Sequence, residues 1–388
     1  MTKRLLNDIG TVEGADWHAG SAHGFGADIH CFDALPPQLE TELDALYQHF
    51  NSSLKHFAFR ARAQGARAYV ARRDGRTLAI FLFHLEHGRI TVLNEMVAIP
   101  AEEIERFARF AFARFSAASV IAFSLIGIDS GALSLPFQQH GHSEDIIVSL
   151  PASADAYLAS LGPKTRHNIR HQMKAISRDR PELQFQTFEN AGIRRQQLMD
   201  LFALKQSNTD RKGIAFGISP EEAEWMVHQA QAGGLLLVAM AGDKLCGGSL
   251  SLKLGDRYFA YVVAFEPGLG KYSLGMLCCY LAMLEKIARK GKQAHLSWGR
   301  QQYKFKLLGV QHDMANIDIY RSRMAYWRHA PGRAKHAAAD YVDRCKRTLL
   351  DSEHRAGSLA AMVRTAIGAM RFVKRSRFRH RLKSQPPA

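Results

Sequence analysis

One short segment of the chain has the composition of a phosphate-binding loop. Residues 268–275 read GLGKYSLG and lie between a predicted strand and a predicted helix. Backbone N–H groups at a helix start have no partner within the helix and lie at the positive end of its dipole, so phosphate oxygens bind there, and glycines let them come close. An ordinary turn into a helix capped by Ser273 is the other interpretation, and the segment alone leaves both open. A pyrophosphate at this place would contact Gly270, Lys271, Tyr272, Ser273 and Gly275.

A basic helix is predicted upstream of this loop. Residues 163–180 (PKTRHNIRHQMKAISRDR) place apolar side chains on one helical face and Arg166 and Arg170 on the other. Guanidinium groups bind phosphates and carboxylates through paired hydrogen bonds, so this face suits an anionic acceptor. A solvated helix face is the alternative interpretation.

A polar segment, residues 204–213 (LKQSNTDRKG), is interpreted as a loop on the way to a sheet. Lys205 would line the same cleft as the basic helix. Asp210 is the nearest carboxylate that can act as a general base. An Asp in a turn more often bonds its own backbone, and this second interpretation stays open.

The elements around the glycine-containing segment follow a definite order. Apolar runs and Gly-Asp turns predict an antiparallel meander over residues 234–241, 245–254 and 257–265. A helix over 273–290 follows, because its apolar residues share one face. Further strands are predicted at 293–298, 303–310 and 316–320.

The first half of the chain repeats this order in a weaker form. Strands over 67–72, 77–85 and 89–99 lead through Pro100 into a helix over 101–115, and a strand over 119–126 follows. Topology persists when side chains drift, so the pattern indicates a duplication. We therefore expect an α/β (α+β) fold of two similar units, each a mixed, mostly antiparallel sheet flanked by helices. The first copy lacks a glycine loop after Pro100 and is expected to bind no phosphate.

Composition limits the class of protein. A chain of 388 residues with 47% hydrophobic content is long enough for two domains. The 5 cysteines lack CxxC spacing and the 18 histidines lack metal-ligand spacing, so we expect free thiols and no metal site. A serine-hydrolase elbow, a nucleotide-triphosphate loop, a secretory signal and an apolar stretch of roughly 20 residues are not found. A cytoplasmic enzyme is expected.

Residues 163–310 resemble the acetyltransferase-like domain of the GNAT type, in the form shared by cellulose-biosynthesis acyltransferase-like proteins and, more distantly, by Fem-type peptidyltransferases. The matching pieces are the LGPKTRHNIRH helix, the meander, the FEPGLGKYSLG loop with its helix, and HLSWGRQQYKFKLLGV. The resemblance implies tandem GNAT-like domains: a degenerate one over 1–150, an acyltransferase domain with the donor site over 151–325, and a basic helical tail over 326–388. Relatives often carry an Asp and a Gly-Asp pair near the last motif, where this chain has Ser297 and Gln301-Gln302.

The resemblance also implies acyl-CoA as the donor, and the lack of a serine-hydrolase elbow favours direct transfer without a covalent intermediate. In GNAT folds the third meander strand offers a backbone N–H to the thioester carbonyl, which here falls near residues 261–264, and Val263 and Phe265 are the expected donor-binding residues of this strand. Lys304 would stabilise developing charge, and Tyr303 or Tyr261 would protonate the leaving thiolate. A core aromatic residue and a surface lysine are the ordinary alternatives for these positions. The expected acceptor-side residues are Arg166, Arg170, Lys205 and Trp298.

Three functions of different classes remain open. The favoured one is an N- or O-acyltransferase of polysaccharide biosynthesis that acts on a saccharide, nucleotide-sugar or lipid-linked precursor. The others are a Fem-like aminoacyl-tRNA-dependent transferase and a non-catalytic binding protein. Residues 321–388 hold 17 Lys and Arg against 4 Asp and Glu, so most of the net charge of +16 lies there. This tail is expected to attract an anionic membrane surface, with tRNA as the alternative partner, which makes peripheral binding to the inner face of the membrane one option.

Overall fold

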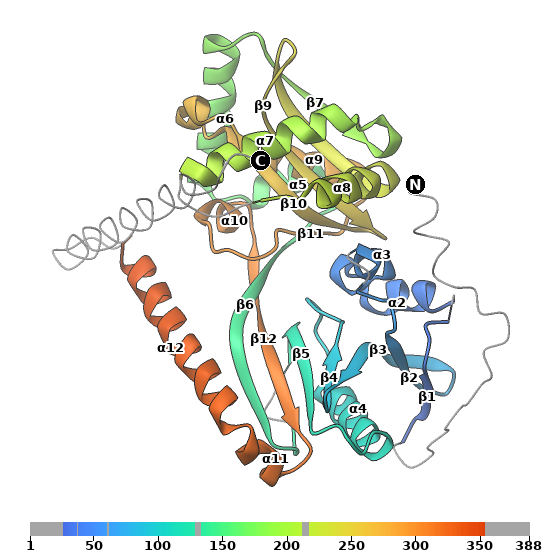
Figure 1. Ribbon diagram of the computed structural model, residues 1–388. Helices are drawn as coiled ribbons and strands as arrows, with labels where there is room; N and C mark the ends of the chain where they lie inside the picture. Colours follow the sequence, from blue (N-terminus) through green and yellow to red (C-terminus); the bar gives the residue numbers. More distant parts are fainter. Residues whose placement is uncertain (1–25, 37, 60–61, 129–132, 212–216, 354–388) are drawn as a thin grey trace, which may run out of the picture.

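The computed structural model describes residues 26–36, 38–59, 62–128, 133–211 and 217–353. Its strands form one twelve-stranded sheet in the order β1-β2-β3-β4-β5-β12-β6-β11-β10-β9-β8-β7 (Figure 1). The strands are β1 (Asp28–Phe32), β2 (Arg67–Arg73), β3 (Arg76–Glu86), β4 (Arg89–Val92), β5 (Val120–Ile126), β6 (Phe137–Ser149), β7 (Leu183–Glu189), β8 (Gly234–Ala241), β9 (Lys244–Leu254), β10 (Arg257–Phe265), β11 (Gln293–His295) and β12 (Val310–Tyr320).

Helices cover both faces of this sheet. In the first half α4 packs on one face, and α2 and α3 pack on the other. In the second half α5, α6 and α9 share one apolar cluster, while α7 and α8 share another. The helices are α2 (Leu39–Tyr47), η2 (Phe50–Ser52), α3 (Leu54–Ala58), α4 (Ala101–Arg114), α5 (Ala154–Ser160), α6 (Pro163–Asp179), η5 (Asn190–Gly192), α7 (Arg195–Arg211), α8 (Pro220–Gly233), η6 (Pro267–Tyr272), α9 (Leu274–Ala288), α10 (Gln302–Lys306), α11 (Arg323–Arg328) and α12 (Ala330–Glu353).

The predicted duplication of the α/β (α+β) fold is confirmed. In the first half β2, β3 and β4 form an antiparallel meander, and α4 then leads to β5, which is parallel to β4. In the second half β8, β9 and β10 form the same meander, and α9 leads to β11, which is parallel to β10. Each half is therefore the same unit of a mostly antiparallel sheet and flanking helices.

Two long strands join the halves. Strand β12 follows the second half in the sequence, yet it pairs with β5 of the first half and with β6 along most of its length. The last residues of β6, from Ile147 to Ser149, pair with β11 of the second half. The proposed limits at 150/151 and 325/326 stay a prediction, and they would assign β12 to a different unit from its neighbour β5.

The structure corrects three local predictions. Residues 303–309 are not a strand, because α10 occupies 302–306, and buried Lys304 of this helix and Leu307 at its C-cap have helical spacing; β12 begins only at Val310. Lys205 and Asp210 do not lie in a loop but in the last turns of α7, whose buried Leu198, Leu201 and Phe202 follow the helical period. The strand after His87-Gly88 ends at Val92 rather than at residue 99.

The tail is helical as far as it is described. Helix α12 lies beside β6, where the Asp340 carboxylate accepts a hydrogen bond from Gly141 N–H at 2.8 Å (Figure 1). Residues 354–388 lie outside the described residues. Among the helices that the structure describes, none combines the length and hydropathy that crossing a lipid bilayer requires.

Candidate active site

Strands β10 and β11 part in the middle of the second half. They pair only from Arg257/Gln293 to Phe259/His295, although β10 continues to Phe265. The register of β10 against β9 shifts between Ala260 and Val262, which places a bulge at Tyr261. Within the described residues, no backbone hydrogen bond joins β10 beyond Phe259 to the chain after His295. The second half thus has an open strand edge that begins at the bulge.

The predicted donor residues Val263 and Phe265 lie on this open edge. Glu266 N–H donates to Cys246 of β9, and backbone groups alternate between the two edges of a strand, so those of Val263 and Phe265 point away from β9. Their carbonyl oxygens accept hydrogen bonds from Lys205 Nζ at 3.4 Å and Asn208 Nδ2 at 2.9 Å. Lys205 is thereby held against the open edge.

The glycine-containing segment lies at the end of the same edge. It forms η6 and the start of α9, so the free N–H groups of the first turn of α9, which begins at Leu274, follow η6 after Ser273. A Cβ added at Gly268 or Gly270 would meet nothing within 4 Å, whereas one at Gly275 would lie 2.5 Å from the ring of Phe265. Gly268 and Gly270 therefore leave open space beside the helix start, and Gly275 is needed for packing.

The other predicted contacts in this loop have different roles. Ser273 does not cap α9 with its side chain, because it adopts a left-handed conformation with φ of 53°. Tyr272 is buried, and its hydroxyl donates to Asp179 of α6 at 3.2 Å. Lys271 is exposed, with its Nζ 4.8 Å from the ring of Tyr272. Of the predicted side chains, Lys271 and Ser273 thus face solvent.

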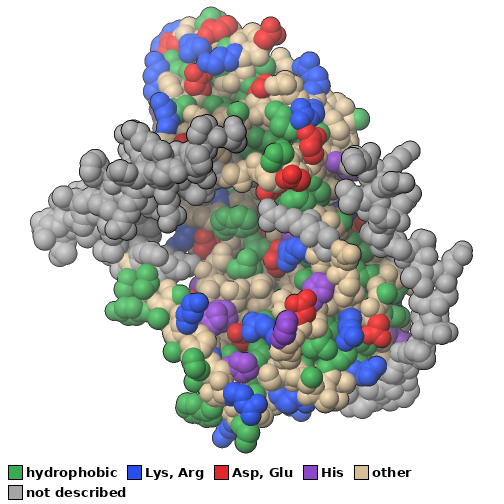
Figure 2. Space-filling model, in the orientation of Figure 1, with side chains coloured by type: hydrophobic (Ala, Val, Ile, Leu, Met, Phe, Trp, Pro, Cys, Tyr) green, Lys and Arg blue, Asp and Glu red, His purple; other side chains and the backbone are tan. Residues whose placement is uncertain are grey.

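The predicted basic helix is confirmed as α6. Ile169 and Ile176 are buried, Arg170 is exposed, and Arg166 donates to the carbonyl of Ala159 at 2.6 Å. Figure 2 shows Lys and Arg side chains gathered at the upper left, over this helix. Asp210 is exposed and accepts a hydrogen bond from Gln206 Nε2 at 2.8 Å. It is a surface residue of α7, so the geometry gives no support to its predicted role as a base.

Lys304 is buried and fully engaged. Its Nζ donates to the backbone carbonyls of Leu296, Ser297 and Trp298 at 2.7, 3.0 and 2.6 Å. Burial lowers its pKa to about 8, against the attraction of the nearby Asp145 and Glu144 carboxylates. Since an ammonium has three N–H groups, none is left for an oxyanion. Lys304 positions the loop after β11 and is not a free charge in the opening.

That loop carries an exposed tryptophan. Glu144 accepts a hydrogen bond from Gly299 N–H at 2.9 Å, so the loop is held at both ends. Trp298 is 62% exposed on it. Tyr303, on α10, is partly buried beside Cys279, and burial raises its pKa well above the usual range. Its phenol therefore stays protonated, and the raised pKa makes it a weaker acid than an exposed tyrosine.

Two predictions remain: Tyr261 as a proton donor, and the cysteines as free thiols. Tyr261 lies at the bulge, 6.1 Å between ring centroids from Trp225 of α8. All five cysteines are free thiols. Burial raises the pKa of the Cys279 thiol to about 11. It is therefore no thiolate nucleophile at neutral pH.

A buried cluster of His49, Asp145 and His295 was not predicted from the sequence. These residues come from the N-cap of η2, from β6 and from β11, and their ligand-type atoms lie within 4.8 Å of one another. A second group, His140, Asp318 and His336, has the same property, but Arg89 also donates to Asp318 at 2.7 Å. Neither group has a local sequence pattern, because its members are about 100 residues or more from one another in the sequence, with the exception of Asp318 and His336.

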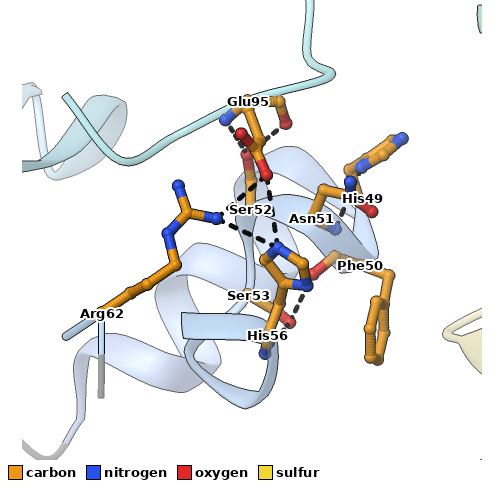
Figure 3. Close-up of polar contacts among 8 residues, drawn as sticks. All are labelled: His49, Phe50, Asn51, Ser52, Ser53, His56, Arg62 and Glu95. Atoms are coloured by element: carbon orange, nitrogen blue, oxygen red, sulfur yellow. Dashed lines mark hydrogen bonds and ion pairs between the residues drawn. The ribbon is translucent and has the colours of Figure 1, made fainter. Parts of the chain in front are cut away.

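In the first half, backbone hydrogen bonds close the corresponding place, where β4 and β5 end their pairing. After β4 the chain returns to β5, with hydrogen bonds from Met96 N–H to Leu125, from Gly127 N–H to Val97 and from Ile99 N–H to Gly127, at 2.7–3.0 Å. Glu95 anchors this return. Figure 3 shows its carboxylate between Arg62 and His56, at 3.1 and 3.2 Å, and its backbone bonded to Ser52 Oγ. The first half therefore has no open strand edge at this place.

Comparison with known proteins agrees with this geometry. Residues 163–307 match a protein-family model described as an acetyltransferase (GNAT) domain. The match covers less than half of the chain, and it lies in the half with the open edge. Residues 163–307 are thus similar to a GNAT-type acetyltransferase domain.

Three solved structures align with much of the chain, and only that of FemX, with a TM-score above 0.5, supports the fold. The structure of FemX aligns with a TM-score of 0.52 and 12% identity over 74% of this chain and 97% of FemX. L-PGS from Bacillus licheniformis aligns with a TM-score of 0.46 and 14% identity over 75% and 93% of the two chains. A tandem GNAT protein from the clavulanic acid biosynthesis pathway aligns with 0.38 and 11% over 66% and 82%. At these identities the likeness concerns the fold alone. No curated protein matches the chain.

Proposed function

We propose that the second half transfers an acyl group from acyl-CoA to a hydroxyl or amino group of a saccharide or a related cell-surface polymer precursor. The observation that carries this proposal is the open edge of β10, which leads from the bulge at Tyr261 to the glycine-containing start of α9 in a GNAT-type domain. An extended thioester donor needs such a combination. Its arm pairs with a free strand edge, and its phosphates lie on free helix N–H groups.

The residues fit this donor. Gly268 and Gly270 leave room for phosphate oxygens, and exposed Lys271 adds a positive charge beside them. The arm would follow the edge at Val263 and Phe265, and the thioester would lie near the bulge. Tyr303, whose phenol keeps its proton, would protonate the leaving thiolate, with Tyr261 as the other candidate.

The acceptor side is proposed from exposed groups around the same opening. Trp298 offers a flat apolar face to a sugar ring, and Arg170 of α6 suits a phosphate or carboxylate of the acceptor. Lys205 lies against the edge itself. The proposed attraction of residues 357–388 to an anionic membrane or to tRNA rests on their charge.

Calorimetric titration of the full chain with CoA, acetyl-CoA, longer acyl-CoAs and an aminoacyl-tRNA tests the donor class. We expect saturable binding of the CoA compounds. Tight binding of the aminoacyl-tRNA without any binding of CoA would favour the Fem-like function instead. A chain that binds none of these donors would leave a non-catalytic binding protein as the better description.

A further inference from the structure

Three ionisable side chains meet where β10 and β11 part. His295 is the last residue of β11 and lies opposite Phe259 of β10, the last pair before the opening. His49 comes from the first half, and Asp145 comes from β6, which lies next to β11 in the sheet. The three side chains are 4%, 5% and 1% exposed, respectively. A buried group at this position is next to the place where the acyl carbon of the donor would lie.

The backbone fixes the proton of His49. Asn51 N–H donates to His49 Nδ1 at 3.2 Å, so this nitrogen carries a lone pair. Burial lowers the pKa of His49 to about 4, which keeps the ring neutral at physiological pH. The single proton of the ring is therefore on Nε2, which lies 3.8 Å from Asp145 Oδ2.

Asp145 in turn fixes the proton of His295. Burial alone would raise the pKa of Asp145, but the hydrogen bond of His295 and the nearby ring of His49 outweigh it and hold this pKa well below the usual range. The ionised Oδ2 lies 2.6 Å from His295 Nδ1, so Nδ1 is the donor. This leaves a lone pair on His295 Nε2 when the ring is neutral. That atom is buried and has no hydrogen-bond partner.

A metal ion is the competing explanation for two histidines and a carboxylate so close together. A histidine that binds a metal through one ring nitrogen donates the proton of its other nitrogen to an acceptor. His49 Nδ1 does the opposite, because it accepts a hydrogen bond from Asn51 N–H. His49 Nε2 therefore has no lone pair for a metal, and the cluster suits proton transfer.

We propose that His295 is the general base of the acyl transfer and that Asp145 and His49 are positioning residues. The proposal rests on the acyltransferase function above. His295 Nε2 takes the proton of the acceptor N–H or O–H, directly or through one water, as the acceptor atom attacks the thioester carbonyl. The C–S bond breaks, the thiolate of CoA receives a proton from Tyr303, and both side chains return to their starting states by exchange with solvent. Acyl-CoA and the acceptor give the acylated acceptor and CoA with its thiol.

The arrangement gives the first half a part in the reaction. His49 packs its ring against His295, with ring centroids 5.0 Å apart, and its Nε2 lies 3.8 Å from Asp145 Oδ2, while Asp145 holds His295 in the productive tautomer through their hydrogen bond. A carboxylate that orients a histidine in this way is the recurring partner of an imidazole base. The closed first half thus supplies a positioning residue to the open second half.

The activity test compares two acceptors. With acetyl-CoA as the donor, glucosamine is largely protonated at neutral pH and must lose a proton to react, whereas hydroxylamine is already a free base. For His295→Gln we expect turnover with glucosamine to fall about 100-fold or more, with KM for acetyl-CoA unchanged and a much smaller loss with hydroxylamine. Equal losses with both acceptors, or no loss, would overturn the proposal.

The positioning roles need a readout of their own. For Asp145→Asn and His49→Gln we expect the pH profile of turnover with glucosamine to move while the CoA affinity stays the same. The profile reflects the groups that face the cluster, which are Arg257 near His49, and Lys304 and Glu144 near Asp145. An unchanged profile in both variants would remove the relay and leave these residues a structural role only.

Nitrogen NMR of the wild-type chain, with labelled histidine, tests the dyad without any activity. We expect the neutral form of His295 to carry its proton on Nδ1 and to lose this preference in Asp145→Asn. A proton on Nε2 of neutral His295 would overturn the proposal. If acetyl-CoA fails to bind in the calorimetric titration, the acyl-CoA function is what fails, whereas normal CoA binding with an unaffected His295→Gln variant rejects the dyad alone.

Discussion

Two glycines of the donor loop differ in what a side chain would meet, and this difference decides which of them can be tested. Gly275 packs against the ring of Phe265, so any substitution there disturbs the start of α9 as well as a ligand. Gly270 faces open space and has no left-handed backbone requirement. A loss of binding at Gly270 therefore reports on the ligand and not on the packing.

For Gly270→Asp we expect CoA affinity to fall at least about tenfold, because a carboxylate would lie where the helix start attracts phosphate. Gly270→Asn is the matched control, since it has nearly the same shape without the charge, and it should lose clearly less. Calorimetry with CoA measures both affinities, and thermal unfolding confirms that both variants fold. Equal losses in the two variants would mean that bulk, and not charge, matters there.

Lys304 illustrates how a charged residue can look catalytic in a sequence and be structural in the protein. Replacing it by Met leaves three carbonyls of the Trp298 loop without their donor. We expect the free energy of unfolding to fall by about 1–3 kcal/mol. Lys306→Met, at an exposed position of the same helix, should change it little. Denaturant unfolding of the two variants checks this, and equal stability of both would show that the three bonds contribute nothing.

At the scale of elements, local patterns predicted the second-half meander to within a residue or two at each strand end. Its turns contain Gly242 and Gly255 with φ of 58° and 60°, a conformation that glycine adopts without strain, so the turn signal was physical. Residues 303–310 were predicted wrongly because a run of five helical residues is too short to show a period. Strand β1 was missed as well, since its edge position against β2 is a tertiary fact.

Helix α9 contains a buried cation with a measurable consequence. Lys286 is 1% exposed, and burial lowers its pKa from 10.5 to about 8. The unfolded chain therefore binds more protons between about pH 8 and 10.5, so this residue makes the free energy of unfolding rise with pH across that window. For Lys286→Met we expect the free energy of unfolding at pH 7 to increase by up to about 3 kcal/mol. The gain in stability that the wild type shows between about pH 8 and 10.5 should be smaller in this variant.

Lys253→Met is the matched control for this measurement. Lys253 also lies near the ring of Tyr258, at 5.7 Å, but it is exposed. Denaturant unfolding at pH 7 and at pH 10 measures the wild type and both variants. A Lys286→Met variant that is less stable at pH 7 would show that the ammonium has favourable partners that outweigh its burial.

The candidate site was predictable only in part. The glycine loop, Val263 and Phe265 follow each other closely in the sequence, so their proximity required no tertiary information. His49, Asp145 and His295 come together because β6 pairs with β11 and because η2 packs on the second half, where Phe50 and Trp225 have ring centroids 6.0 Å apart. Neither event leaves a local pattern, and so the cluster could not be foreseen.

At the scale of the whole molecule the two halves have diverged at one structural point. In each half, the third meander strand pairs with the following parallel strand over three residues and then separates from it. In the first half the chain re-pairs with β5 through Met96, Val97 and Ile99, whereas in the second half the edge stays open. The first half also starts α4 with Glu102 and Glu103, two carboxylates that pair with Arg106 of the same helix.

We therefore expect one donor site per chain. Calorimetric titration of purified protein with CoA should give a stoichiometry of one, and Gly270→Asp should remove it. A second, weaker site that survives Gly270→Asp would place a donor in the first half. In that case Glu103→Gln, at the start of α4, should strengthen that site if it lies there.

Because β12 follows the second half in the sequence but pairs with β5 of the first half, we expect the two halves to unfold together. β12 lies between β5 and β6, so the first half has its own sheet edge covered by a strand that the chain reaches only after the second half. Ile317 and Ile319 of β12 belong to the apolar cluster of the first half, so loss of β12 would expose that core. Two-state behaviour is ordinary for small single domains, and a two-domain chain departs from it unless the domains share a core.

We expect calorimetric unfolding of residues 26–353 to show one transition. Ile317→Ala, which removes buried methyl groups from the first half, should move this whole transition and lower the free energy of unfolding by about 2–5 kcal/mol. Leu236→Ala, in the buried core of the second half, should shift the same single transition. If each variant instead moves a separate transition, the halves are independent, and the limit at 150/151 describes the molecule better than the shared sheet does.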